Sequence, residues 1–255
     1  MNSSLSILNT FFDKIYVVTL TRATNRQTKI KEILKDVDYE FFYGVDKMNL
    51  DIDVLKKENI YNEEQAIKLH KNSKPMFLGQ VACSLSHRKL YEKILAEGYE
   101  KVLIFEDDFI VDENAVKTIA NAFQQLPPSW DLWYLGYYLN EETTRKMKLK
   151  QFFYLLLSYI KLIKFSPLQV KNLYAKPFSK NLMKAGFHNT THSYAVNKKA
   201  LQKLINAQTP VVFPADTLLS NLIISEKIEA YISTPKIFLQ EIFLENGSKE
   251  SFVSE

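Results

Sequence analysis

Residues 101–109 read Lys-Val-Leu-Ile-Phe-Glu-Asp-Asp-Phe, an apolar run that leads directly into three consecutive carboxylates. The residues from Val102 to Phe105 are branched or aromatic and too few for a helix, which predicts a buried strand. Ionised carboxylates are costly to remove from water, so three of them after a buried strand predict a cleft or a bound cation. Ligands of open α/β sheets bind beyond the carboxyl ends of the strands. The segment therefore predicts an α/β fold with a ligand site at residues 106–108.

The spacing of these carboxylates favours a metal site. In an extended chain Glu106 and Asp108 face one way and Asp107 the other. Two oxygen ligands on one side suit Mn²⁺ or Mg²⁺, which are bound by a few carboxylates together with substrate phosphates. The alternative is a solvated acidic turn that leads into a helix with Asp112 as its N-cap. On these residues alone both interpretations stay open.

Candidate strands and helices alternate along most of the chain. Strands are expected at residues 15–20, 39–43, 102–105, 130–135, 193–196, 228–232 and 237–239, and helices at 24–34, 51–69, 78–96, 112–126, 197–205 and 216–224. The helix at 51–69 is expected to be interrupted near Asn59, and the strand at 130–135 to end at Gly136. This alternation predicts a mostly parallel sheet with helices on both faces. With 46% hydrophobic residues, we expect residues 1–255 to form one domain with a sizeable core.

Residues 141–186 fit this alternation poorly and are expected to form an insertion. They contain the aromatic and apolar run 152–163 between lysines, and residues 143–215 hold 13 basic residues but no acidic one. A basic, aromatic helix of this kind can lie in a membrane interface, whereas the alternative is a core helix with solvated lysines. The charge alone admits an anionic membrane, an anionic acceptor or nucleic acid as partner. No nucleic-acid recognition motif accompanies it, so we expect no nucleic acid.

Cysteine content and hydropathy bear on the compartment. The single cysteine, Cys83, excludes an internal disulfide framework and fits a reducing compartment. Residues 1–10 lack the apolar core of a signal peptide. No stretch reaches the roughly 18 apolar residues of a membrane span. These features predict a cytoplasmic protein.

Several short motifs occur in a recognisable order. Residues 78–87 read Leu-Gly-Gln-Val-Ala-Cys-Ser-Leu-Ser-His, and residues 103–108 read Leu-Ile-Phe-Glu-Asp-Asp. With the weaker segments 17–26, 41–46, 192–196, 214–216 and 235–240, they resemble the motifs of glycosyltransferase family 25, which includes bacterial lipooligosaccharide and collagen galactosyltransferases. The chain departs from the family pattern at four positions, with Thr19 for Asn, Asn25 for Asp, Gln80 for Glu and Ala82 for Gly. Gln80 matters most, because a carboxylate able to bind metal or take a proton has become neutral.

The resemblance implies a GT-A type fold, a nucleotide-sugar donor (commonly UDP-galactose), a divalent cation at the acidic motif, and inversion at the anomeric carbon. The cation, Mn²⁺ or Mg²⁺, would be held by Asp108, Glu106 and His192. The donor would be bound by Thr19, Leu20, Arg22, Arg26, Asp46, Gly79, Gln80, Ser86, His87, Glu106 and Asp107.

An inverting transfer requires a general base that takes the proton of the acceptor hydroxyl. Asp216 is the first choice, because it is the first acid after the acid-free run, follows Pro214 closely and opens a predicted helix. The alternative role for Asp216 is stabilisation of that helix N-terminus. Glu241 is the second choice.

The sequence thus predicts a metal-dependent inverting glycosyltransferase that transfers galactose from UDP-galactose to a lipooligosaccharide or other surface glycan. We expect it at the cytoplasmic face of the inner membrane, where the basic segment meets anionic lipid or a lipid-linked saccharide acceptor. The alternatives are a non-catalytic glycan- or membrane-binding relative and a metal-dependent phosphoesterase.

Overall fold

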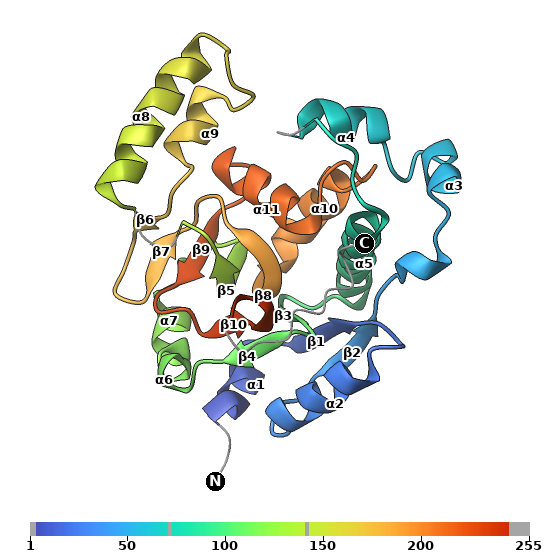
Figure 1. Cartoon of the computed structure of the whole chain (residues 1–255). Helices are drawn as coiled ribbons and strands as arrows, with labels where there is room; N and C mark the ends of the chain where they lie inside the picture. Colours follow the sequence, from blue (N-terminus) through green and yellow to red (C-terminus); the bar gives the residue numbers. More distant parts are fainter. Residues whose placement is uncertain (1–3, 71–72, 141–142, 245–255) are drawn as a thin grey trace.

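The protein is built on one central sheet, seen in the computed structural model, which describes residues 4–70, 73–140 and 143–244. Its eight strands lie in the order β2-β1-β3-β8-β5-β9-β7-β6 (Figure 1). The strands of this sheet are β1 (Lys14–Thr19), β2 (Glu40–Tyr43), β3 (Lys101–Glu106), β5 (Leu132–Tyr138), β6 (Lys176–Pro177), β7 (Leu182–Lys184), β8 (Asn189–Asn197) and β9 (Ala230–Ser233). A separate two-stranded sheet joins β4 (Phe109–Val111) to β10 (Phe238–Gln240).

Most strands of the central sheet point in the same direction, as the sequence predicts, and only β7 and β8 of the described strands in this sheet oppose them. Strand β1 pairs in parallel with β2 and β3, and β5 pairs in parallel with β9. Strand β8 runs antiparallel to both β3 and β5, so β3 and β5 themselves point the same way. The carboxyl ends of β2, β1, β3, β5 and β9 therefore lie along one edge, where a ligand site is expected.

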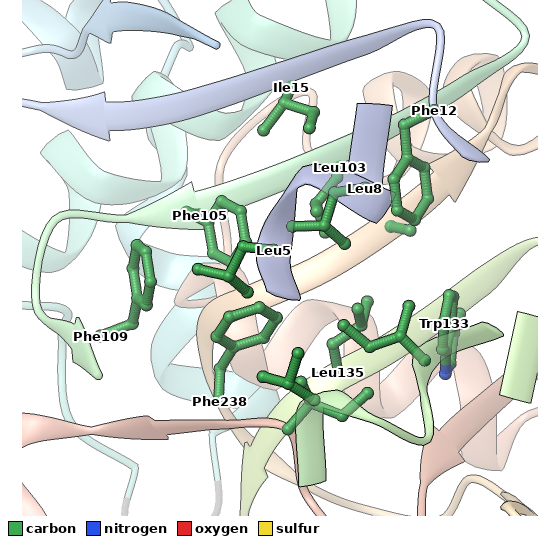
Figure 2. Close-up of a cluster of buried hydrophobic side chains, with 14 of the residues drawn as sticks. Leu5, Leu8, Phe12, Ile15, Leu103, Phe105, Phe109, Trp133, Leu135 and Phe238 are labelled. Atoms are coloured by element: carbon green, nitrogen blue, oxygen red, sulfur yellow. The ribbon is translucent and has the colours of Figure 1, made fainter. Parts of the chain in front are cut away.

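Helices cover both faces of the sheet, which confirms the predicted fold class. One face carries α1 (Leu8–Phe11), α2 (Thr24–Ile33), α6 (Glu113–Val116) and α7 (Ile119–Gln125), and the other carries α5 (Leu78–Glu97), α10 (Lys198–Ala207) and α11 (Ala215–Ile224). Alternation along β3 supplies both cores: Leu103 and Phe105 face the first, and Val102 and Ile104 the second. Figure 2 shows Leu103 and Phe105 in the first core.

The remaining described elements lie beside α5 or at the sheet edge. Helices α3 (Ile52–Lys57) and α4 (Glu63–Leu69) contribute to a third apolar cluster, and short 3-10 turns occur at Ser4–Ile7, Lys47–Asn49 and Glu241–Phe243. The predicted interruption near Asn59 is present, because Asn59 takes a positive φ of 53° between α3 and α4.

Two predicted boundaries are wrong. Strand β5 does not end at Gly136 but continues to Tyr138. A Cβ on Gly136 would lie 2.2 Å from His192 Nε2, so this glycine makes room for a buried side chain rather than a turn. The predicted helix at 112–126 is divided into α6 and α7, although Asp112 caps α6 as expected.

Residues 143–186 of the predicted insertion form α8 (Arg145–Tyr159), α9 (Pro167–Lys171) and the edge strands β6 and β7; Glu141 and Glu142 lie outside the described residues. Helix α8 packs on α9, which packs on α11 (Figure 1). The alternative of a core helix is wrong, since Ser158 is the buried residue within α8. Across the described part of the chain, no helix has both the length and the apolarity needed to cross a membrane.

Candidate active site at the end of strand β3

The predicted acidic motif opens into a cleft of about 340 Å³ at the carboxyl ends of β1 and β3. Its walls come from β1, α2, α5, the turn after β3, the start of β8, the start of α11 and the segment after β10. The predicted site residues on its wall are Thr19, Leu20, Arg26, Gly79, Gln80, Ser86, His87, Glu106, Asp107, Asp108 and Asp216. The structure therefore brings together residues that lie almost 200 positions apart in the chain.

The three carboxylates line the same cleft, so the expectation that Asp107 faces away from the other two is wrong. That expectation assumed an extended chain, but β3 ends at Glu106 and residues 107–108 form a turn. An aromatic cluster of Phe105, Phe109 and Phe238 packs beside this turn. Phe105 stacks on Phe109 with ring centroids 4.3 Å apart, and Phe238 of β10 packs edge-on against both (Figure 2).

Glu106 is held by polar partners from two elements. Its Oε1 lies 3.1 Å from His87 Nε2 of α5, and the Thr191 hydroxyl of β8 donates to the same oxygen. His87 is fixed in turn, because its Nδ1 lies 2.7 Å from the Tyr194 hydroxyl. Burial alone would raise the pKa of Glu106, but the hydrogen bond and the charge of His87 lower it. Glu106 therefore stays ionised.

Asp107 is directed towards β1 and α2. It accepts a hydrogen bond from Thr19 Oγ1 at 2.5 Å and forms an ion pair with Arg26 Nη1 at 2.8 Å. Burial raises the pKa of Asp107, although Thr19 and Arg26 oppose that shift. Two of the predicted donor-binding residues thus support Asp107, and they do so from the cleft wall.

Asp108 differs from the other two because one of its oxygens has no partner. Its Oδ2 accepts a hydrogen bond from Gln240 Nε2 at 2.8 Å, whereas Asp108 Oδ1 and Gln240 Oε1 are buried and unpaired among the described residues. Burial, and next the charge of Glu106, raise the pKa of Asp108 to about 7. Both side chains line the cleft, so a bound ligand could supply the missing partner of these two oxygens.

These oxygens fit a divalent cation of the Mn²⁺ or Mg²⁺ type. Asp108 and Glu106 supply carboxylate oxygens and Gln240 an amide oxygen, which are the ligands such hard cations prefer. A second group, of Cys83, His87 and Glu106, brings its possible ligand atoms within 4.8 Å of one another. Burial raises the pKa of the Cys83 thiol, which disfavours the thiolate that a metal requires. The oxygen set is therefore the better candidate.

Asp216 enters the cleft from the first turn of α11. Its carboxylate accepts hydrogen bonds from the backbone N–H of Thr190 at 3.2 Å and of Thr217 at 2.6 Å. Pro214, and not Asp216, occupies the N-cap position, but Asp216 lies in the first turn and accepts the Thr217 N–H there, so the alternative role of stabilising the helix N-terminus is also supported. Gln80, in contrast, accepts a hydrogen bond from the Phe77 N–H through Oε1 at the start of α5. An amide performs that capping role as well as the carboxylate of the family pattern would.

Four predicted site residues are not part of the cleft wall. Arg22 and Asp46 form an ion pair at 2.5 Å, which lowers the pKa of Asp46, and Glu241 forms an ion pair with Lys29 at 2.7 Å. His192 is buried, with its ring nitrogens 2.7 Å from Thr190 Oγ1 and 3.2 Å from the Phe238 carbonyl oxygen.

The assignment of His192 as a metal ligand therefore needs correction. Burial lowers the pKa of His192 to about 4, so its ring is neutral. Both ring nitrogens are used within the protein, and the side chain packs against Gly136 behind the cleft. The sequence predicted no role for Gln240, although this residue ends the segment 235–240 that resembles one of the family motifs.

This fold and this cleft define an α/β protein with an acidic ligand site at the carboxyl edge of its sheet. The family model described as Glycosyltransferase family 25 (LPS biosynthesis protein) matches residues 12–219. The chain belongs to this family.

Curated relatives agree with the family assignment. A "Glycosyltransferase 25 family member" of Aedes aegypti is 32% identical over 127 residues, covering 48% of this chain and 21% of that protein. "Procollagen galactosyltransferase 2" of Mus musculus is 23% identical over 206 residues, covering 77% and 28%. "Inactive glycosyltransferase 25 family member 3" of Mus musculus is 27% identical over 133 residues, covering 49% and 22%. The chain thus spans about a quarter of the length of these relatives.

Among solved structures, the chain is similar to a glycosyltransferase involved in the glycosylation of the major capsid of PBCV-1. The match covers 89% of this chain and 92% of that one. The sequence identity is 12% and the TM-score is 0.40.

Proposed function

We propose that this protein is a metal-dependent inverting glycosyltransferase that transfers galactose from UDP-galactose to a lipooligosaccharide or another surface glycan. The observation that carries the proposal is the unpaired Asp108 Oδ1, buried beside Glu106 at the end of β3. Family membership supports the reaction class, the galactosyltransferase among the relatives supports the sugar, and the family's description supports the acceptor.

The acidic turn would receive the diphosphate of the donor. Asp108 and Glu106, with the amide oxygen of Gln240, would hold Mn²⁺ or Mg²⁺. Such a cation neutralises the negative charge that develops on the leaving diphosphate. His87 and Thr191 hold Glu106 ionised and in place, while Arg26 and Thr19 do the same for Asp107. The side chains are thus oriented before the donor arrives, which reduces the reorganisation needed during the reaction.

Asp216 would act as the general base. Its two backbone hydrogen bonds fix the carboxylate in the wall of the cleft, on a different element from the acidic turn. A positioned carboxylate can take the proton of the acceptor hydroxyl as that oxygen attacks the anomeric carbon. Glu241 is the weaker candidate because Lys29 neutralises it. We place the reaction at the cytoplasmic face of the inner membrane, as the composition predicts.

The test is release of UDP from purified protein given UDP-galactose and a soluble glycan acceptor, with Mn²⁺ and with EDTA. We expect release to require the cation and to fall at least about 100-fold in Asp108→Asn, as for loss of one electrostatic contact to the reacting group. Glu113→Gln is the matched control, since it removes an exposed carboxylate from nearby α6. Release that is unaffected by EDTA would exclude the metal role.

Two other outcomes would replace the proposal. Binding of UDP without its release from any nucleotide sugar would indicate a non-catalytic relative, such as the inactive family members. Hydrolysis of a phosphoester in the absence of a sugar acceptor would indicate a phosphoesterase.

A further inference from the structure

Helix α8 presents an apolar face to solvent. Its large exposed side chains recur at spacings of three and four residues, which places them on one side of a helix. They are Leu149, Phe152, Phe153, Leu156, Tyr159 and, directly after the helix, Ile160, and between 49% and 64% of each is exposed. These six residues are called the α8 apolar face below.

Two polar residues of α8, Gln151 and Ser158, lie on its inner side. Gln151 donates a hydrogen bond to the Val170 carbonyl oxygen of α9 at 2.7 Å, and Ser158 is the buried residue of the helix. A helix that belonged only to the folded core would show the reverse arrangement, with its apolar stripe inside. The stripe continues past the helix at Leu162, which is 69% exposed. A contiguous apolar patch of this kind marks an interaction site.

Basic residues frame this face. Arg145, Lys146, Lys148 and Lys150 are exposed in the first turns of α8, and Lys161 is exposed just after it. The surrounding sequence, residues 143–215, contains no acidic residue. The combination of a protruding apolar stripe with flanking cations is complementary to an anionic bilayer, which offers both an apolar interior and negative headgroups.

The same charges argue against a second copy of this chain as the occupant. Two α8 apolar faces pressed together would bring two sets of like-charged basic residues close to one another, which is unfavourable. Because α8 does not qualify as a membrane-spanning helix, it would lie in the plane of the interface.

We propose that the α8 apolar face is a docking surface for an anionic lipid bilayer. Leu149, Phe152, Phe153 and Leu156 enter the boundary between headgroups and acyl chains, and the flanking lysines contact lipid phosphates. Helix α9 packs against both α8 and α11, and α11 carries Asp216 in its first turn. Docking of α8 therefore holds the cleft at a defined position relative to the membrane. The inference does not depend on the reaction proposed above.

Sedimentation with vesicles tests it. Purified protein is mixed with vesicles of phosphatidylcholine alone or of phosphatidylcholine with phosphatidylglycerol. We expect binding to the anionic vesicles only, weakened by high salt. The double variant Phe152→Ser with Phe153→Ser should lose about tenfold or more in partition coefficient, because both rings leave the interface. The matched control, Met48→Ser with Val54→Ser, removes two exposed apolar side chains from another surface and should bind normally.

Three results would overturn the proposal. They are equal binding of native protein to neutral and anionic vesicles, no binding to either, and equal binding by the Phe152/Phe153 variant. Sedimentation velocity without lipid adds a fourth: a dimer that dissociates in the Phe152/Phe153 variant would show that a second copy covers the face. UDP release with a soluble acceptor should be unchanged in this variant, which separates failure of docking from failure of catalysis.

Discussion

The acidic cleft and the α8 apolar face depart from ordinary burial in opposite directions. In the cleft, carboxylates are withdrawn from water, and Asp107 is only 7% exposed. On α8, by contrast, large aromatic and aliphatic side chains are exposed to water along one face of a single helix. The two regions differ in where the interaction partners of these side chains come from. Thr19, Arg26, His87 and Gln240 satisfy the cleft almost completely from within the chain, whereas α8 depends on a partner from outside.

The largest effect should come from breaking an internal partnership of the cleft. Arg26→Met leaves Asp107 buried without its counter-charge, so urea unfolding at pH 7 should show a loss of about 4 kcal/mol in the free energy of unfolding. The control is Arg22→Met, whose partnership with Asp46 is at the surface with Arg22 44% exposed, and we expect a loss below about 1 kcal/mol. Equal losses in the free energy of unfolding of the two variants would contradict the idea that Asp107 depends on a counter-charge supplied by the protein itself.

The buried His192 should also limit stability in acid. The pKa of His192 falls to about 4 on folding because the ring is buried, so the unfolded chain takes up a proton first. The stabilisation of the fold by the neutral His192 ring is complete above the ordinary histidine pKa of about 6.5. It is lost as the pH falls from there through 4, and the loss is about 3 kcal/mol at pH 4. Unfolding curves at pH 7 and pH 4 should therefore differ less for His192→Gln than for native protein. An identical pH dependence in both proteins would refute this role.

A smaller effect concerns cation binding at Asp108, which rests on the proposed metal site. Since the pKa of Asp108 is raised to about 7, a proton competes for the carboxylate below that pH. Mn²⁺ affinity, measured by titration calorimetry, should fall about tenfold from pH 8 to pH 6. Asp108→Asn should bind weakly and without this dependence. A flat profile in the native protein would argue against Asp108 as a ligand.

The smallest effect is expected on α8, and this sharpens the contrast with the cleft. Phe152→Ser together with Phe153→Ser should change the free energy of unfolding without lipid by less than about 0.5 kcal/mol, because more than half of each residue is already exposed. Leu103→Ala, at a fully buried position of β3, should cost about 3 kcal/mol in the same assay. A large loss in the α8 variant would mean that this face supports the fold.

The sequence predicts those features that depend on local pattern. Strand β3, helix α5 and the acidic turn follow from apolar periodicity and from the placement of charges, and they position Glu106, Asp108 and His87. The direction of β8 could not be predicted, because a strand buried on both faces has the same composition whether it runs parallel or antiparallel.

Contacts between residues that lie far apart in the sequence could not be predicted either. Arg22 pairs with Asp46, and Gln240 reaches Asp108 across 132 positions of sequence. Periodicity carries no information about such pairs, so Arg22 and Asp46 were each assigned to the donor rather than to one another. His192 illustrates the same limit: its burial and its hydrogen bond to Phe238 decide its role, and neither is encoded in the residues beside it.

The pairing of β10 with β4 extends the site beyond residue 219, where the family match ends. Asp108 bonds to Gln240 through its side chain and to the Glu241 N–H through its carbonyl oxygen. A ligand that binds the cleft only when residues 238–243 are in place would be linked to their docking, and each would then alter the other by the same factor. The rate at which a protease cuts residues 238–243 would then report on ligand binding. A fusion that displaces this segment would weaken ligand binding.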